Sequence, residues 1–494
     1  MSKKSFDNTN SLGSFYPYYC RTDAGEQNLY PNLSSLLKTE ECRTVLDEQA
    51  ALQMLNRYFM FGDRTIFRDI KRMPWMAKRD SNKDGWEFHS VPAHGIKKDM
   101  TEDQVAGTLF ELLCKEISLY TADHRRVGIL LSGGMDSRIV AAVLNHVVKK
   151  KDIAAESVTA YTWGVDDSRD VVYSRQIAQM FGWNWKHFRV EAEDLWENFR
   201  IAGERGCEYS GLHLHACPQI SRNIASEVDV MLAGSYGDSV GRAEYSGTTV
   251  TKLAPIQGRF RNPAFLINSS LYNRIKSEWK TDVEAYHVLF PRPEEYQQRE
   301  LDRQLHYMRR MLSPCLELSN EKVEMYQAFT HPDVFGFMWS LHPQLRNDRV
   351  YERLLEHANP DLLRIPWART GLRFPLIEGK PDSYRKKHHE YAEFMQTDLI
   401  DRIQARLSDH SAIRNGIFNV GSVSSVISLI RKKRNYNFDY LEKMAWLVSY
   451  TYLYDRVDIE IESKPKQSVA DAFNAKLLAP LEYRARHAYR AFRD

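Results

Sequence analysis

An alternation of short apolar runs with amphipathic segments between residues 127 and 232 most restricts the folds open to this chain. Residues 127–131, 157–162 and 228–232 predict buried strands, and residues 137–148 and 171–180 predict helices that follow the first two. Strands that alternate with helices form βαβ units, and their connections place the strands parallel in one sheet. The sequence therefore predicts an α/β fold, a parallel twisted sheet with flanking helices.

The segments on either side of this core differ from it in pattern. Short strand-like runs and turns at 62–67 and 82–85 predict a small β-rich domain over residues 1–95. Thr101 with Gln104 forms a capping-box pattern, which predicts a helix start at the beginning of the core domain, 96–260. Residues 261–494 predict a mostly helical part. Its basic tail predicts a surface helix with a cationic face, formed by Lys476, Arg484, Arg486, Arg490 and Arg493.

Charge and hydropathy exclude several classes of protein. The 494 residues carry 68 Lys plus Arg and 65 Asp plus Glu, a net charge of +3, so we expect no nucleic-acid partner. Mean hydropathy is −0.52, and no apolar run approaches the roughly 18 residues of a membrane span. The polar N-terminus lacks the apolar centre of a signal peptide. We therefore predict a cytoplasmic protein without a membrane span.

The six cysteines are too sparse for a disulfide scaffold and include no C-x-x-C pair, so we predict reduced thiols at Cys20, Cys42, Cys114, Cys207, Cys217 and Cys315. Cys207 and Cys217 enclose His213 and His215, which suggests a metal site. Zinc ligands usually come in tighter pairs, and we therefore predict a structural role for these four residues. The basic run 385–389 predicts a solvated helix face.

A glycine-rich turn, Ser132-Gly133-Gly134-Met135-Asp136-Ser137, joins the first predicted strand to its helix. The two glycines allow a tight turn whose backbone N–H groups form an anion nest, to which Ser132 and Ser137 add hydroxyl donors. The helix start adds the positive end of its dipole. Asp136 fits beside a polyphosphate when Mg²⁺ is present, because Mg²⁺ binds one or two carboxylates together with phosphate oxygens. The turn is not a Walker A loop.

This turn resembles the S-G-G-x-D-S pyrophosphate loop (PP-loop) of the ATP pyrophosphatase superfamily, whose members cleave ATP to AMP and pyrophosphate. Residues 232–239, Leu-Ala-Gly-Ser-Tyr-Gly-Asp-Ser, resemble the L-S-G-E-G-G-D-E segment of asparagine synthetases. Residues 161–173, 330–334 and 368–376 are similar to that family's second strand and its helix start, to its P-F-L-D helix and to its P-K-T-G-F-G-V-P-L segment. From about residue 60 to 455 the chain is identified as asparagine synthetase-like, which implies an adenine nucleotide alpha hydrolase-like fold.

The resemblance also implies roles for individual residues. The pyrophosphate would be held by Ser132, Gly133, Gly134, Asp136 and Ser137. Asp136 and Asp238 would bind Mg²⁺, and the adenosine pocket would be lined by Leu131, Trp163 and Gly234. Arg369 stands where the family has a Lys against the pyrophosphate, and it keeps the charge but not the geometry. Asp136, Asp238 and Arg369 are the expected catalytic residues.

Three departures from the family concern the nitrogen-transfer half of the reaction. Residue 2 is Ser where a glutaminase has its cysteine nucleophile, and residues 1–95 are about half the expected length, so we interpret them as a truncated glutaminase-like remnant without glutamine hydrolysis. Ser235 and Ser239 replace two Glu residues, and Ser cannot serve as a base at neutral pH without a partner. Tyr236, Glu244 and His215 are candidates to replace the lost acid at 235.

The sequence therefore favours an ATP-dependent, AMP-forming amide ligase that uses ATP and Mg²⁺. It would adenylate a substrate carboxylate, and an amine or ammonia would then displace AMP. The ammonia would come from solution or from a separate amidotransferase or pathway enzyme. A uronic acid, a peptide side chain and an internal amine that closes a lactam stay open as substrates. The alternative is a nucleotide-binding regulatory or assembly subunit without ligase activity.

Overall fold

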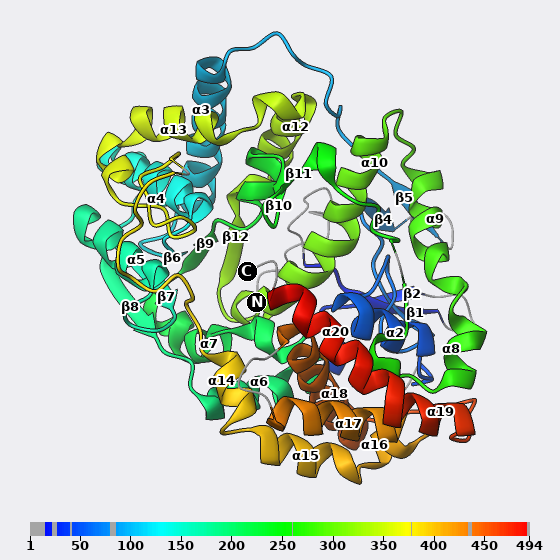
Figure 1. The fold of residues 1–494 in the computed structure, drawn as a ribbon. Helices are drawn as coiled ribbons and strands as arrows, with labels where there is room; N and C mark the ends of the chain where they lie inside the picture. Colours follow the sequence, from blue (N-terminus) through cyan, green and yellow to red (C-terminus); the bar gives the residue numbers. More distant parts are fainter. Residues whose placement is uncertain are drawn as a thin grey trace.

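The computed structural model describes residues 15–21, 27–39, 42–79, 85–258, 260–376, 378–432 and 437–491. Within these ranges, a parallel sheet of five strands in the order β12-β9-β6-β7-β8 lies at the centre (Figure 1). The strands are β6 (Arg126–Leu130), β7 (Ser157–Trp163), β8 (Asn184–Phe188), β9 (Val230–Ala233) and β12 (Glu324–Gln327). The prediction of an α/β fold with a parallel sheet is confirmed.

Alternate residues of the inner strands enter two different cores, as the two-residue period of a strand requires. In β9, Val230 and Leu232 pack on one side of the sheet, and Met231 and Ala233 on the other. The first side is covered by α3 (Glu102–Thr121), α4 (Met135–Lys150), α5 (Arg169–Phe181), α12 (Pro332–Ser340) and α13 (Asp348–Ala358). The second is covered by α6 (Ala192–Glu204), α7 (Cys217–Glu227), α11 (Ser313–Asn320) and α18 (Phe438–Arg456).

Helix α3 begins where the capping-box pattern predicts. The Thr101 hydroxyl accepts the backbone N–H of Gln104 at 3.3 Å, and the Gln104 side-chain oxygen accepts the backbone N–H of Thr101 at 2.8 Å. Two donors that the helix would otherwise leave open are thus satisfied.

The N-terminal part is rich in β-structure, as predicted. Strands β1 (Tyr18–Arg21), β2 (Gln27–Tyr30) and β3 (Ile70–Arg72) form an antiparallel sheet with β1 in the middle, and β4 (Ala77–Arg79) pairs with β5 (Trp86–Phe88). Helices α1 (Leu33–Leu37) and α2 (Glu48–Arg57) pack beside them, and α2 is buried along most of its length.

A buried ionic cluster joins this part to the core domain. The guanidinium of Arg72, on β3, lies 3.1 Å from Glu208 and 2.9 Å from Glu317, and Arg310 lies 2.8 Å from Glu208. All four side chains are almost fully buried, and the two arginines lower the pKa of Glu208 despite its burial. Arg72 is the member contributed by the N-terminal part, and removing it would leave Glu208 and Glu317 each with one basic partner fewer, so the cluster helps to hold that part in place.

The prediction that all six cysteines are reduced thiols is wrong. Cys20, on β1, and Cys42 form a disulfide, with their Cα atoms 5.9 Å apart. Cys42 follows Cys20 by 22 positions, and the segment between them includes strand β2, which returns the chain antiparallel to β1. The prediction is confirmed for Cys114, Cys207 and Cys217, which are free thiols, and the side chain of Cys315 lies outside the described part of the chain. No helix in the described ranges combines the length and the apolarity that a membrane crossing requires.

The C-terminal part is mostly helical, as predicted, and α20 crosses the front of α18 in Figure 1. Its further helices are α8 (Ser269–Ile275), α9 (Thr281–Leu289), α10 (Glu295–Asp302), α14 (Tyr391–Gln396), α15 (Ile400–Ser408), α16 (Ser411–Arg414), α17 (Val420–Lys432), α19 (Val469–Phe473) and α20 (Ala479–Ala491). One strand of the central sheet, β12, also comes from this part, beyond the predicted domain boundary at 260.

Candidate active site

The glycine-rich turn lies between β6 and α4, at the carboxyl edge of the sheet where ligands of such folds bind. Its two serines close the turn on itself. The Ser132 hydroxyl accepts the backbone N–H of Gly134 at 3.1 Å, and the Ser137 hydroxyl accepts the backbone N–H of Ser132 at 3.1 Å. The backbone N–H of Gly133 donates to Asp170 at 3.1 Å. These N–H groups therefore already point at oxygen acceptors, which the oxygens of a phosphate could replace.

Two glycines let the end of β9 approach the start of α4. A Cβ on Gly234 would lie 2.5 Å from the backbone nitrogen of Ser137, and a Cβ on Gly237 would lie 2.5 Å from the Cβ of Asp136. No side chain fits at either position without moving backbone. This close approach places Asp238, in a π-helical turn at Gly237–Gly241, beside Asp136.

The Asp136 and Asp238 carboxyls form a site that fits a divalent cation. Oδ1 of Asp136 is buried without a hydrogen-bond partner among the described residues, and Asp238 accepts the backbone N–H of Ser239 at 2.8 Å. Burial raises the pKa of both carboxyls, and the charge of Asp136 helps to raise the pKa of Asp238 to about 7. Two half-buried carboxyls side by side, one of which raises the pKa of the other, together with a buried oxygen that lacks a hydrogen-bond donor, suit Mg²⁺, which binds carboxylate oxygens.

Arg242 is the basic side chain closest to this pair. Its guanidinium lies 3.7 Å from Asp136, 3.9 Å from Glu244 and 3.0 Å from Asp348. Arg369 lies further out: it pairs with Glu244, is 42% exposed and does not line the cavity described below. Arg369 is therefore linked to the Asp pair indirectly: it contacts Glu244, Glu244 contacts Arg242, and Arg242 contacts Asp136.

A cavity of about 410 Å³ opens on the glycine-rich turn. Of the residues predicted to bind nucleotide, it is lined by Leu131, Ser132, Gly134, Asp136, Ser137, Trp163 and Gly234. Gly133 and Asp238 do not line it. Its remaining walls are Leu130, Thr162, Asp170, His213, His215, Cys217, Ala233, Ser235, Met311, Leu312, Leu316 and His388. The cavity thus has a polar end at the turn and an apolar end at 311–316.

Histidines form one wall of the cavity. The ring of His215 stacks on Trp163 with centroids 5.7 Å apart, and Nδ1 of His215 lies 2.9 Å from the hydroxyl of Tyr391. The backbone of His215 has φ +48°, a value that non-glycine residues seldom adopt. Burial lowers the pKa of His215 well below its usual value, and the neighbouring His388 and His213 lower it further. His215 is therefore a neutral imidazole at pH 7.

The other residues of the Cys207–Cys217 segment do not converge as metal ligands. His213 pairs with Glu442 at 2.8 Å, and the backbone carbonyl of Cys207 accepts the indole N–H of Trp446 at 2.9 Å. The one group of potential ligands within bonding range of a common ion, among the described residues, lies elsewhere.

Of the three candidates to replace the acid at 235, one lines the cavity. The Tyr236 hydroxyl is buried at 2.9 Å from that of Ser313, and Glu244 pairs with Arg369. Neither lines the cavity, whereas His215 does, as does Ser235 itself. Ser239 donates to the carbonyl of Tyr236 at 3.2 Å and does not line the cavity.

Arg138, which the sequence analysis did not single out, holds the segment that carries Arg369. Its guanidinium is fully buried and donates to the backbone carbonyls of Gly133, Leu362, Ile365 and Pro366 at 2.7–3.2 Å. The backbone N–H of Ala368 donates to Gly133 as well, at 3.1 Å. Burial lowers the pKa of Arg138 to about 9, so the group stays charged at neutral pH. One cation thus ties residues 362–368 to the glycine-rich turn.

His388 was also missed, because the basic run 385–389 was expected on a solvated helix. The run is not helical: Arg385 bridges to Ser168, the carbonyl of His388 accepts the backbone N–H of Val165, and the His388 ring lines the cavity. A signal in the sequence was the pair of histidines, which is unusual for a purely solvated face.

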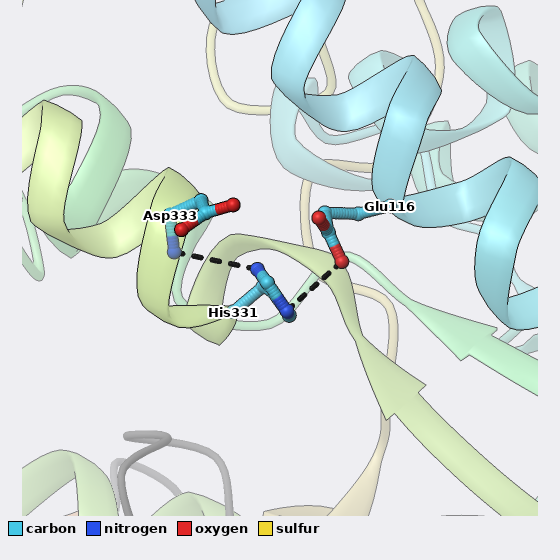
Figure 2. A group of neighbouring side chains, drawn as sticks. All are labelled: Glu116, His331 and Asp333. Carbon is cyan, nitrogen blue, oxygen red and sulfur yellow. Dashed lines mark hydrogen bonds and ion pairs between the residues drawn. The ribbon is translucent and has the colours of Figure 1, made fainter.

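Residues 330–334 lie away from the cavity, at the start of α12 against α3. Figure 2 shows the His331 ring between Glu116 and Asp333, with Nε2 at 3.0 Å from Glu116 and Nδ1 accepting the backbone N–H of Asp333 at 3.3 Å. The three side chains are close enough for a metal ion, but the Lys115 ammonium already lies 3.1 Å from Asp333. Because both imidazole nitrogens and Asp333 have partners, we assign this group a helix-capping role.

Comparison with known proteins gives a family match over the part of the chain that carries the cavity. The family model described as asparagine synthase matches residues 111–417. The chain is 42% identical to the glutamine-hydrolysing asparagine synthetase of Gallus gallus over 59 residues, 12% of this chain and 10% of that protein. The match thus spans about a tenth of that relative's length.

Two solved structures show weak overall likeness. NMN synthetase from Francisella tularensis is 12% identical and covers 43% of this chain and 97% of its own, with a TM-score of 0.23. The U34-tRNA thiolase NcsA from Methanococcus maripaludis, with its 4Fe–4S cluster, is 13% identical and covers 73% of this chain and 87% of its own, with a TM-score of 0.25.

Proposed function

Because the chain belongs to the asparagine synthase family, we propose that it is an ATP-dependent, AMP-forming amide ligase. A substrate carboxylate would attack the α-phosphorus of ATP, which forms an acyl-adenylate and releases pyrophosphate. An amine or ammonia would then attack the acyl carbon, releasing AMP and one proton. The observation that carries the proposal is the half-buried Asp136–Asp238 pair beside a serine- and glycine-lined turn that opens on a cavity of about 410 Å³.

The residues of the cavity suit the first step. The backbone N–H groups of the turn and the hydroxyls of Ser132 and Ser137 would bind the pyrophosphate, and Leu131, Trp163 and Gly234 would contact the adenosine. Asp136 and Asp238 would hold Mg²⁺, which when bound neutralises charge on the phosphate oxygens. We propose that Arg369 adds a further positive charge once it leaves Glu244 for the pyrophosphate.

The test is ATP–pyrophosphate exchange with Mg²⁺ across a panel of carboxylates: aspartate, uronic acids, acidic peptides and amino-carboxylates that could close a lactam. Exchange that needs one of them would support adenylation and identify the acceptor class. The Gly234→Ala variant is the control, because its added Cβ would clash with Ser137 and should remove exchange. ATP binding without exchange for any carboxylate would instead favour a nucleotide-binding subunit without ligase activity.

We further propose that His215 accepts the proton of the attacking amine, in place of the Glu replaced by Ser235. Replacing His215 with alanine should lower the rate of amide formation about 100-fold, the effect of losing a general base, and leave ATP–pyrophosphate exchange within about threefold of wild type. Because the pKa of His215 is well below its usual value, it stays neutral at pH 6, and we expect no loss of rate between pH 8 and 6 from this group.

Separate assays of exchange and of amide formation measure the two steps. Tyr391→Phe is the matched control: it removes the hydroxyl next to Nδ1 of His215 but keeps the ring, so the rate should fall less than in the alanine variant. An unchanged rate of amide formation in His215→Ala would exclude His215 as the base.

A further inference from the structure

The last helical stretch of the described chain carries apolar side chains on two opposite faces. Helix α19, a π-helical turn at Asn474–Leu478 and α20 follow each other without a break. The inner face, Asp471, Ala475, Ala479 and Tyr483, is buried against the rest of the protein. Of the predicted cationic face, Lys476 and Arg484 are exposed and Arg486 pairs with Asp439 and Glu482. The side chains of Arg490 and Arg493 lie outside the described part of the chain.

The outer face carries a row of exposed apolar side chains, which we call the C-terminal ridge: Val469, Phe473, Leu477 and Leu481, exposed by 89%, 53%, 46% and 50%. They recur every four residues, so they lie one above the other along about 18 Å of helix. Single exposed apolar residues are common on protein surfaces, but a continuous row marks a site of interaction.

The charges around the ridge are all of one sign. Between Lys464 and Arg486, the exposed charged side chains are Lys464, Lys466, Lys476 and Arg484, and none of these four forms an ion pair with a described residue. The two acidic residues of this segment have their side chains engaged in contacts within the protein. Asp471 caps α19 through Ser468, and Glu482 accepts the backbone N–H of Ala264 and pairs with Arg486. The rim of the ridge is therefore cationic.

We propose that the C-terminal ridge is the docking site for an amphipathic, acidic helix of a partner protein. A row of side chains four residues apart fits between the rows of a second helix, the commonest way in which helices pack. Acidic residues flanking the partner's apolar face would meet Lys476 and Arg484. A second copy of this chain would bring these cations against their own copies. A lipid surface would demand a wider apolar face than a single row whose opposite side is already buried.

Two designed helical peptides test this proposal. The first has leucine every four residues, flanked by glutamate, and the second has lysine in place of the glutamate. Fluorescence anisotropy with the full chain should show binding of the glutamate peptide. The Phe473→Glu, Leu477→Glu double variant should weaken it at least tenfold. Lys476→Glu with Arg484→Glu should weaken it at least fivefold and strengthen binding of the lysine peptide. Val288→Glu, at a still more exposed apolar site on α9, should change nothing.

Because the substituted side chains point outward, circular dichroism should report folded variants. Equal binding of both peptides, or binding that the ridge variants leave intact, would overturn the proposal. Binding to vesicles of anionic phospholipid that Phe473→Glu abolishes would assign the ridge to a membrane surface instead. A dimer in light scattering that Phe473→Glu dissociates would assign it to a second copy of the chain.

Discussion

Replacing Asp136 with asparagine should abolish ATP–pyrophosphate exchange, by at least about 1,000-fold, and yet raise the melting temperature of the metal-free protein. The loss of exchange follows because the variant removes half of the carboxylate pair that we propose for Mg²⁺ and so the charge neutralisation at the phosphates. The gain in stability follows because Asp136 and Asp238 lie side by side and half-buried, and the charge of Asp136 disfavours the ionised form of Asp238. We expect a rise of about 2–4 °C, the shift that about 1 kcal/mol produces in a large domain.

The pH dependence of the free energy of unfolding has a definite sign. The pKa of Asp238 is raised to about 7 in the folded protein, so between its usual value and pH 7 the folded state holds a proton that the unfolded state has released. Stability of the metal-free protein should therefore fall as pH rises from about 4 to about 7 and then level off. In Asp136→Asn this fall should be smaller, because one cause of the raised pKa is gone.

Differential scanning fluorimetry with and without Mg²⁺ measures both effects. Mg²⁺ should raise the melting temperature of the wild type but not of Asp136→Asn. The matched control is Asp348→Asn, which makes the same chemical change at a carboxylate that touches Arg242 but does not line the cavity. Exchange that survives in Asp136→Asn would remove the carboxylate pair from the proposed mechanism.

Replacing Arg138 with methionine should produce the largest loss of stability of the substitutions considered, about 3–5 kcal/mol. Methionine keeps the apolar length of the side chain but removes four hydrogen bonds. The carbonyls of Ile365 and Pro366 lose their donor, whereas those of Gly133 and Leu362 keep a backbone N–H, and each buried unpaired carbonyl costs about 1–3 kcal/mol before the chain relaxes. Because those carbonyls include that of Gly133, ATP binding should weaken together with stability.

Urea unfolding and ATP titration test this expectation. Arg138→Lys keeps the charge but reaches fewer carbonyls, so it should lie between the wild type and the methionine variant. Arg125→Met removes an exposed arginine paired with Glu156 and should cost less than about 1 kcal/mol. If Arg138→Met unfolded at the same urea concentration as the wild type, the guanidinium would not be what joins residues 362–368 to the turn.

The sequence predicted the inner strands of the sheet but not its edges. Strands β6, β7 and β9 are buried on both faces; β6 and β9 have nearly continuous apolar runs, and β7 is rich in β-branched and aromatic residues, which favour strands. The edge strands β8, Asn184–Phe188, and β12, Glu324–Gln327, are half exposed and carry Lys, His, Glu and Gln among their few residues. Nothing in such short mixed segments separates a strand from a loop, so their place in the sheet depends on tertiary pairing.

The residues of the candidate site also fall into two groups, those that the sequence could predict and those that it could not. The turn at 132–137 is local in sequence, and its residue types could be read as a phosphate site from the order of the chain alone. Arg138 and His388 act through contacts with segments more than 200 residues away, and their roles emerge only when the chain is folded. The disulfide between Cys20 and Cys42 likewise depends on the hairpin of β1 and β2, which composition does not reveal.

The position of β12 has a consequence for how this protein can be divided. The strand next to the one that ends in the Asp238 turn comes from residues 324–327, so the central sheet is completed only after more than half of the chain has been synthesised. A fragment that ends at residue 260 would display the open edge of β9, with unpaired backbone groups that recruit strands from other molecules. Expression trials should therefore keep β12 and the segment that Arg138 holds together with β6–β9, and extend through α18, because that helix covers the second side of the sheet.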